Sequence, residues 1–226
     1  NAHDLPVLVY HGLDNRYPYA SHRLHRFILE ASRSLEQGLA QRGVRFVRYV
    51  RRPGNERRGL VYELCQDAAA LVTDDAAAYE ARANARRVAQ RIDIPLYLVD
   101  SALCVPHRLF ASKRLDDLRT FRSAHKPHRE FQMSAWEEPS PRAHLFHDAP
   151  IDWHDPLPAS NEVLDALIAT CDVDMSLPPA PTFHGSRQEA IKRLDDTEQL
   201  VLDRYNFKCS NPVLCYATSR LSPHLH

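Results

Sequence analysis

A cluster of hydroxyl and guanidinium groups lies near the C-terminal end of the sequence. Thr218, Ser219 and Ser222 place three hydroxyls within five residues, and Arg220 lies between them. Serine followed by proline favours the start of a helix, with Ser222 as the N-cap and Pro223 at the first helical position. A helix N-terminus gathers unpaired N–H groups, and arginine carries a permanent charge suited to phosphate. The segment is therefore a candidate phosphate-binding turn, although the same residues could form a helix cap alone.

Histidine is the other abundant residue type that could do chemistry. Three histidine pairs are spaced by three residues, namely His22/His25, His125/His128 and His144/His147. This spacing can put two rings on one helical face. None of the pairs comes with a cysteine or a helical His-Glu-x-x-His pattern, so we expect no metal site.

Two further groups have weaker functional interpretations. Cys209 and Cys215 lack the CxxC spacing of redox sites, which favours a structural or incidental role. Asp74 and Asp75 follow a predicted strand, where ligands of open α/β sheets bind, but a helix N-cap is the favoured interpretation. No Ser/His/Asp or Cys/His set can be assembled, so no catalytic residue is assigned.

Short apolar runs alternate with helical patterns in the first half of the chain. The apolar runs predict strands over residues 6–11, 44–50, 70–73 and 94–99. Apolar residues three and four apart predict helices over 22–42, 60–69 and 76–92. Because crossovers between parallel strands put helices on both faces, this order predicts an α/β fold with a doubly wound, mostly parallel sheet. No Gly-x-Gly-x-x-Gly follows any strand, so the dinucleotide fingerprint is absent.

The composition changes after a further possible helix over 113–124. More than half of the sixteen prolines lie between Pro127 and Pro181, as expected of an interdomain connector that a weak helix over 160–170 interrupts. An amphipathic helix over 186–205 follows, capped by Ser186, and it leads to Tyr205. We therefore predict an α/β domain over 1–124, a Pro-rich connector over 125–182 and the start of a helical domain over 183–226.

Bulk properties restrict the class of protein. Lysine plus arginine and aspartate plus glutamate balance at 29 each, so the net charge does not indicate a nucleic-acid binder. Five scattered cysteines argue against a disulfide framework and favour a reducing compartment. With no apolar run long enough for a bilayer and no signal-like N-terminus, we expect a cytoplasmic protein without a membrane partner. Because the chain starts at Asn1 and stops inside a motif, we expect a fragment of a longer protein.

The C-terminal turn resembles a known family signature. Residues 218–226, Thr-Ser-Arg-Leu-Ser-Pro-His-Leu-His, are similar to the T-S-R-L-S-P-x-L-H-F-G signature that opens the helical flavin domain of the DNA photolyase/cryptochrome superfamily. Tyr205, Asn211 and Pro212 fill the places of an upstream tyrosine and turn, with one extra residue after Pro212. Cys209 replaces an arginine that members often carry, which puts one DNA contact in doubt. The resemblance implies an FAD site formed by Tyr205, Thr218, Ser219, Arg220, Leu221 and Ser222.

The α/β part also resembles the N-terminal domain of that superfamily, especially its class II-like and related bacterial members. The likeness lies in Ser21 to Glu30, an Arg-Gly-Val-Arg-Phe strand start, Val72 to Asp75 and Val99-Asp100 followed by Val105-Pro106. Family members carry a further strand and helix before this point, so we expect the first βα unit to be missing. An antenna chromophore, a deazaflavin or a folate, is common at this domain. The arginine-rich stretch 48–58 could contact DNA or such a chromophore, although a solvated loop is the favoured interpretation.

The resemblance implies the function of the whole protein. That function is flavin-dependent DNA photolyase, which repairs ultraviolet-induced pyrimidine dimers by light-driven electron transfer from reduced FAD, with UV-damaged DNA as the partner and a monomer as the expected state. The lesion pocket and electron-relay residues would lie beyond His226, so the isolated fragment should neither hold FAD tightly nor repair DNA. One alternative is a cryptochrome-like FAD photoreceptor without repair activity. Another is a stand-alone α/β binding module, as in electron-transfer flavoproteins or stress proteins, which leaves the C-terminal turn unexplained.

Overall fold

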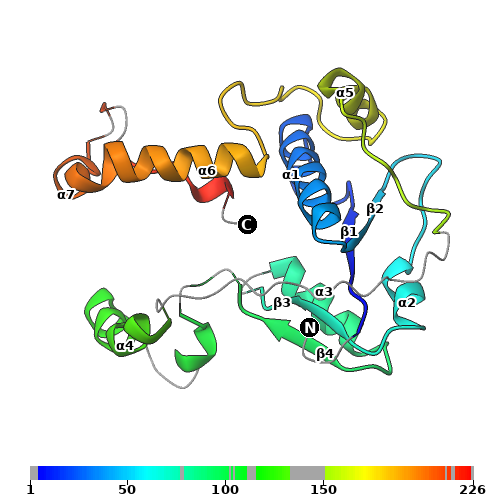
Figure 1. The fold of residues 1–226 in the computed structure, drawn as a ribbon, viewed down its shortest axis with the longest axis horizontal. Coiled ribbons are helices and arrows are strands. Elements are labelled where there is room, and N and C mark those ends of the chain that lie inside the picture. The colour runs from blue at the N-terminus through cyan, green and yellow to red at the C-terminus, as the bar shows by residue number, and fades with distance from the viewer. Residues whose placement is uncertain are drawn as a thin grey trace. The chain divides into compact units, whose positions relative to one another are not determined.

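The computed structural model describes residues 5–76, 79–101, 103, 105–110, 116–132, 151–211, 213–214 and 217–224. The chain divides into two compact units (Figure 1). Unit 1 comprises residues 1–57 and 141–226, and unit 2 comprises residues 58–140.

Unit 1 begins with a β-α-β motif formed by β1 (Leu8–Leu13), α1 (His22–Gln41) and β2 (Arg45–Val50). The two strands pair in parallel, with Leu8 opposite Arg45 and Leu13 opposite Val50. Parallel neighbours need a long crossover, and α1 supplies it. The C-terminal part of unit 1 is helical, with α5 (Asn161–Ala169), α6 (Arg187–Asp196), a π-helical turn (Thr197–Val201), a 3-10 turn (Leu202–Arg204), α7 (Tyr205–Lys208) and a last 3-10 turn (Ser222–His224).

The start of α1 is capped from two directions. Ser21 is the N-cap, as predicted, and its hydroxyl accepts a hydrogen bond from the third residue of the helix. The N–H groups of His22 and Arg23 donate to the carbonyls of Asp174 and Leu177, at 2.9 and 3.1 Å. The predicted connector therefore satisfies backbone donors that a helix start leaves without partners.

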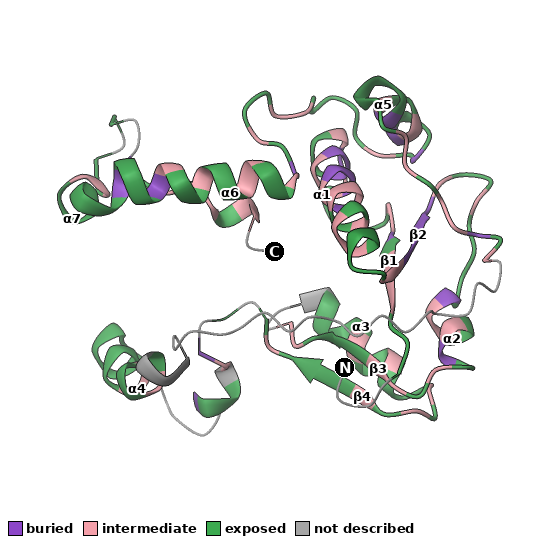
Figure 2. Ribbon diagram, viewed as in Figure 1, coloured by how far each residue is buried: buried purple, intermediate pink, exposed green. Residues whose placement is uncertain are grey.

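The core of unit 1 joins α1, both strands and α5. Its buried residues are Leu13, Leu29, Val50, Leu164, Ile168 and Cys171. Figure 2 shows the buried residues of α1 in its N-terminal half, and α1 contacts both α5 and β2. Because α5 lies within the predicted connector, that segment contributes to the core and does not merely link two domains.

The edge of β2 is covered by residues 153–155. All residues of β2 after Arg45 are buried, and Trp153 packs edge-on against Tyr10 of β1 at 5.8 Å. The Asp155 N–H donates to the Arg48 carbonyl at 2.8 Å, and the Asp155 carboxylate accepts from the Val50 N–H at 2.9 Å. These contacts supply hydrogen-bond partners to backbone groups of β2 that would otherwise lack them at the edge of the sheet.

Unit 2 contains a second parallel pair, β3 (Leu71–Asp74) and β4 (Leu96–Val99). Its helices are α2 (Leu60–Cys65), α3 (Tyr79–Ala89), a 3-10 turn (His107–Phe110) and α4 (Leu118–Gln132). Parallel strands alternating with helices confirm the α/β class. In the described residues the four strands form two pairs. The domain boundaries and the missing first βα unit stay predictions.

Two helical segments extend beyond their predicted ends, whereas α2 and α3 are shorter than the predicted helices 60–69 and 76–92. The helix predicted to end at 124 is α4, which includes Pro127 and runs to Gln132. A proline removes one hydrogen bond of the helix but does not end this one. The helix predicted over 186–205 begins as expected, because the Ser186 hydroxyl accepts from the Glu189 N–H at 3.2 Å. It continues through the π-helical and 3-10 turns into α7. None of the described helices is both long and apolar enough to cross a membrane.

Two buried histidines of unit 1 make its stability depend on pH. Burial lowers the pKa of His25 to about 4, and burial together with the charge of Arg48 lowers the pKa of His11 to about 4. Unfolded histidines titrate near 6.5, so the unfolded chain binds more protons between pH 6.5 and 4. We expect the free energy of unfolding to be fully retained above pH 6.5 and to fall toward pH 4, by at most ~3 kcal/mol for each ring. Urea unfolding at a series of pH values measures how the free energy of unfolding depends on pH. The His25→Gln variant should show a weaker dependence. The same pH dependence as in the wild type would contradict a lowered pKa of His25.

Candidate functional site

The C-terminal turn presents its polar side chains to solvent. Thr218, Arg220 and Ser222 are exposed, whereas Ser219 and Leu221 are half-buried. In the part of the chain that the structure describes, the three exposed side chains have no hydrogen-bond or ion-pair partner. Two hydroxyls and a guanidinium are thus available on one short segment.

Backbone geometry makes the turn tight. Arg220 has a φ of 53°, in the left-handed region that residues other than glycine rarely adopt. The Leu221 N–H donates to the Ser219 hydroxyl at 3.4 Å, and the His224 N–H donates to the Leu221 carbonyl at 2.8 Å. The predicted helix start at Ser222 is seen as one 3-10 turn, so the groups suited to an anion here are side chains more than a helix end.

The upstream residues of the family signature make no hydrogen bond to this turn in the described part of the chain. Tyr205 begins α7 and is 47% exposed, and in the described residues no hydrogen bond joins its side chain to the turn. Asn211 forms a local turn through its side-chain oxygen, which accepts from the Val213 N–H at 3.1 Å. Pro212 lies outside the described residues. Among the described residues, hydrogen bonds therefore connect members of the turn to one another, and the place of Tyr205 in the flavin site stays a prediction.

His224 anchors the turn to α1. Its ring packs against the ring of Phe27, with 5.4 Å between the ring centroids. The His224 Nε2 atom is buried without a hydrogen-bond partner among the described residues. Burial lowers the pKa of His224, and the charge of Arg193 on α6 lowers it further, against a smaller opposing effect of Glu189. The end of the turn is therefore held mainly by packing.

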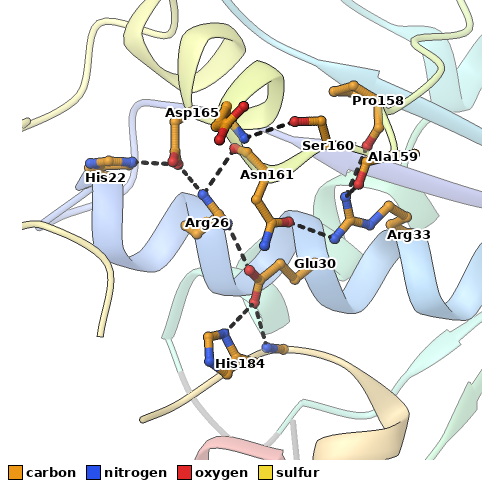
Figure 3. A network of polar contacts seen from close by, with 12 residues as sticks. His22, Arg26, Glu30, Arg33, Pro158, Ala159, Ser160, Asn161, Asp165 and His184 are labelled. Carbon is orange, nitrogen blue, oxygen red and sulfur yellow. Dashed lines mark hydrogen bonds and ion pairs between the residues drawn. The ribbon is translucent and has the colours of Figure 1, made fainter. Parts of the chain in front are cut away.

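A partly buried network of ion pairs and hydrogen bonds holds the connector against α1 (Figure 3). The Arg26 guanidinium donates to Glu30 at 2.7 Å and to Asp165 of α5, which also contacts His22 at 2.8 Å. Although burial alone would raise it, hydrogen bonds from Arg26 and His22 lower the pKa of Asp165. On the same helix, Arg33 binds the carbonyls of residues 158 and 159 and the side chain of Asn161. The network fixes α5 to α1.

Glu30 also holds the start of α6. Its second carboxylate oxygen accepts from the Gly185 N–H at 2.9 Å and lies 3.7 Å from the His184 ring. Gly185 lies directly on the backbone of α1, because a Cβ there would be 2.0 Å from the Phe27 carbonyl oxygen. Sequence reasoning did not identify this assembly. A glycine directly before the predicted N-cap Ser186 was a signal of close backbone approach that could have revealed it.

Residues 48–58 were interpreted as a solvated loop, and this is wrong for the first residues of the stretch. Arg48 is fully buried and Arg51 is 9% exposed. The Arg48 guanidinium donates to the Ser32 hydroxyl and to Glu36 of α1, each at 2.8 Å, and to the Asp155 carbonyl at 3.2 Å. Arg48 is therefore a structural residue that joins β2, α1 and the connector.

The remaining candidates have structural partners. In unit 2, Asp74 accepts a hydrogen bond from Ser101, and Asp75 forms an ion pair with Arg108 at 3.2 Å. His125 and His128 both pack against Phe110. No group of three or more histidine, cysteine or carboxylate side chains among the described residues is arranged to hold a metal ion. His144, His147 and Cys215 lie outside the described residues, and Cys209 is a free thiol.

Comparison with known proteins identifies the family. The family model described as DNA photolyase matches residues 1–143. The deoxyribodipyrimidine photo-lyase of Methanothermobacter thermautotrophicus (strain Delta H) is 28% identical over 232 residues, covering 98% of this chain and 46% of the relative. The crystal structure of an archaeal photolyase from Sulfolobus tokodaii with two FAD molecules has a similar fold, with a TM-score of 0.59 at 19% identity, covering 99% of this chain and 46% of that one. The chain thus spans about half the length of these relatives, and because the family model matches more than half of its residues, it belongs to the DNA photolyase family.

Proposed function

We propose that this chain is part of a flavin-dependent DNA photolyase that binds FAD at residues 218–222. The observation that carries the proposal is the turn in which Thr218, Arg220 and Ser222 are exposed and unpaired among the described residues. Membership of the photolyase family, and a structurally similar photolyase whose crystals hold FAD, support it. The whole protein would repair pyrimidine dimers in UV-damaged DNA.

The residues of the turn fit a pyrophosphate group. A guanidinium donates two parallel hydrogen bonds to phosphate oxygens, and hydroxyl groups add single bonds. Ser219 has a different role, because its hydroxyl already accepts from the Leu221 N–H and shapes the turn. Arg220 and the two exposed hydroxyls would therefore contact the phosphates, while Ser219 and Leu221 keep them in place.

In this proposal the flavin carries the electron chemistry and the protein binds and orients it. When bound and reduced, FAD would donate an electron to the dimer under light. No residue of this chain is assigned a catalytic role. The proposal includes an antenna chromophore, which would be a deazaflavin or a folate. It also includes that the protein is a monomer in the cytoplasm. A cryptochrome-like photoreceptor would use the same FAD contacts without repair.

Substitution of Arg220 tests the FAD site. In the full-length gene product we expect Arg220→Ala to raise the Kd for FAD about 10-fold, because a charge-assisted pair of hydrogen bonds is lost. Arg220→Lys should give a smaller increase, since the charge remains but the planar fork does not. Arg220→Gly, which accepts the left-handed backbone without strain, should resemble the alanine variant.

Flavin fluorescence titration of the apoprotein measures these constants. Arg58→Ala is the matched control, because it removes an exposed arginine elsewhere and should leave the Kd unchanged. Arg220 variants that bind FAD as tightly as the wild type would rule out the proposed phosphate contact.

A further inference from the structure

One face of α1 contacts both ends of residues 185–224, the segment that carries the candidate flavin site. Phe27, Glu30 and Ser34 follow one another at helical spacing and share a face. Glu30 accepts from the Gly185 N–H at 2.9 Å, and the Ser34 hydroxyl accepts from the Arg187 N–H at 3.1 Å. These contacts fix the first residues of the segment. At its other end, the Phe27 ring packs on His224 at 5.4 Å.

The two ends are held by different kinds of interaction. The start of the segment has hydrogen bonds and a glycine in contact with the α1 backbone, so its position is strongly determined. The far end is held to α1 by the Phe27 ring contact, and that ring is half-buried. The position of the turn is therefore sensitive to a change at Phe27.

Hydrogen bonds connect this ring contact to the Ser219 hydroxyl of the turn. The His224 N–H binds the Leu221 carbonyl, and the Leu221 N–H binds the Ser219 hydroxyl. Arg220, between them, has left-handed backbone geometry, which costs free energy and persists only where the surroundings enforce it. Holding His224 in place is one way in which the protein enforces it.

We infer that Phe27 is a positioning residue for the phosphate-binding turn. It lies on α1, outside the residues proposed to bind the phosphates, and through His224 it holds the backbone of the turn that carries Arg220 and the neighbouring hydroxyls. The inference rests on the proposed FAD site. It predicts that Phe27 affects the binding of the phosphates and not the binding of the isoalloxazine ring.

A comparison of two flavins in the full-length gene product tests this role. FAD carries the pyrophosphate, whereas riboflavin has the same ring system and no phosphate. We expect Phe27→Leu, which keeps an apolar side chain for packing, to raise the Kd for FAD about 5- to 10-fold. The Kd for riboflavin should stay within about twofold of the wild type, within the error of such measurements.

Further variants separate positioning from general destabilisation. Phe27→Tyr keeps the ring and should restore FAD binding. His224→Ala should weaken FAD binding by a similar factor, and combined with Phe27→Leu it should add little, because both remove one contact. Leu24→Ala changes an exposed apolar residue of the same helix and should have no effect.

The outcomes are distinguishable. Wild-type protein that binds no FAD would overturn the proposed function and this inference with it. Wild-type protein that binds FAD, with a Phe27→Leu variant that binds FAD equally well or loses both flavins alike, would overturn this inference alone.

Discussion

Replacing Gly185 with alanine is expected to destabilise unit 1 by about 3 kcal/mol and to release the start of α6 from α1. The added Cβ would lie 2.0 Å from the Phe27 carbonyl oxygen and 2.8 Å from the Ala31 nitrogen, and both are backbone atoms of a helix that cannot move aside. The displacement would also take the Gly185 N–H away from the buried Glu30 carboxylate. Urea unfolding of the two proteins measures the difference.

Gly38→Ala is the matched control for this prediction. Gly38 lies within α1, and an added Cβ there would have no neighbour within 4 Å. Because alanine favours a helix more than glycine does, this variant should be more stable by about 0.5–1 kcal/mol. A Gly185→Ala protein as stable as the wild type would show that the chain before α6 does not lie against α1 as described.

The second large effect is expected at Arg48. Arg48→Met should reduce the free energy of unfolding by about 1–3 kcal/mol, because it leaves the partly buried Glu36 carboxylate without its guanidinium partner. The Ser32 hydroxyl and the Asp155 carbonyl would lose their guanidinium donor as well. Removing the positive charge should also raise the pKa of His11, which burial and Arg48 together lower to about 4.

Chemical denaturation gives the stability change, and NMR titration of the histidines gives the pKa change. Arg16→Met is the control, since Arg16 pairs with Asp14 at the surface, and the unfolding midpoint of that variant should not move. An Arg48→Met protein with wild-type stability and an unchanged His11 pKa would contradict the buried position of the guanidinium.

Local sequence patterns predicted most of the secondary structure. Ser21 and Ser186 are N-caps in the structure. Each was predictable because an N-cap serine bonds to a backbone N–H only three residues later in the chain. The four strands and their order were predictable because short apolar runs, bounded by turn residues, alternate with longer helical patterns. The end of α4 was not, because a proline usually ends a helix but does not do so at Pro127.

Contacts between distant residues could not be predicted. In sequence, Arg48 belongs to an arginine-rich stretch that is typical of solvated surface, and its burial depends on Glu36 of α1 and on Asp155, far along the chain. The candidate flavin site is a second example. The family signature indicated residues 218–222, but no local pattern indicated that Phe27 contacts His224 of this segment. A single sequence shows which residues alternate or repeat, but not which distant segments meet.

Light-driven repair is the most direct test of the proposed photolyase function. The full-length gene product would be purified in the dark, its absorption spectrum recorded, and the protein then illuminated with dimer-containing DNA. The proposal predicts the bands of a bound flavin and a loss of pyrimidine dimers that requires light. Bound flavin without loss of dimers would contradict repair and favour a photoreceptor, and a protein without flavin would leave residues 218–222 as a helix cap alone.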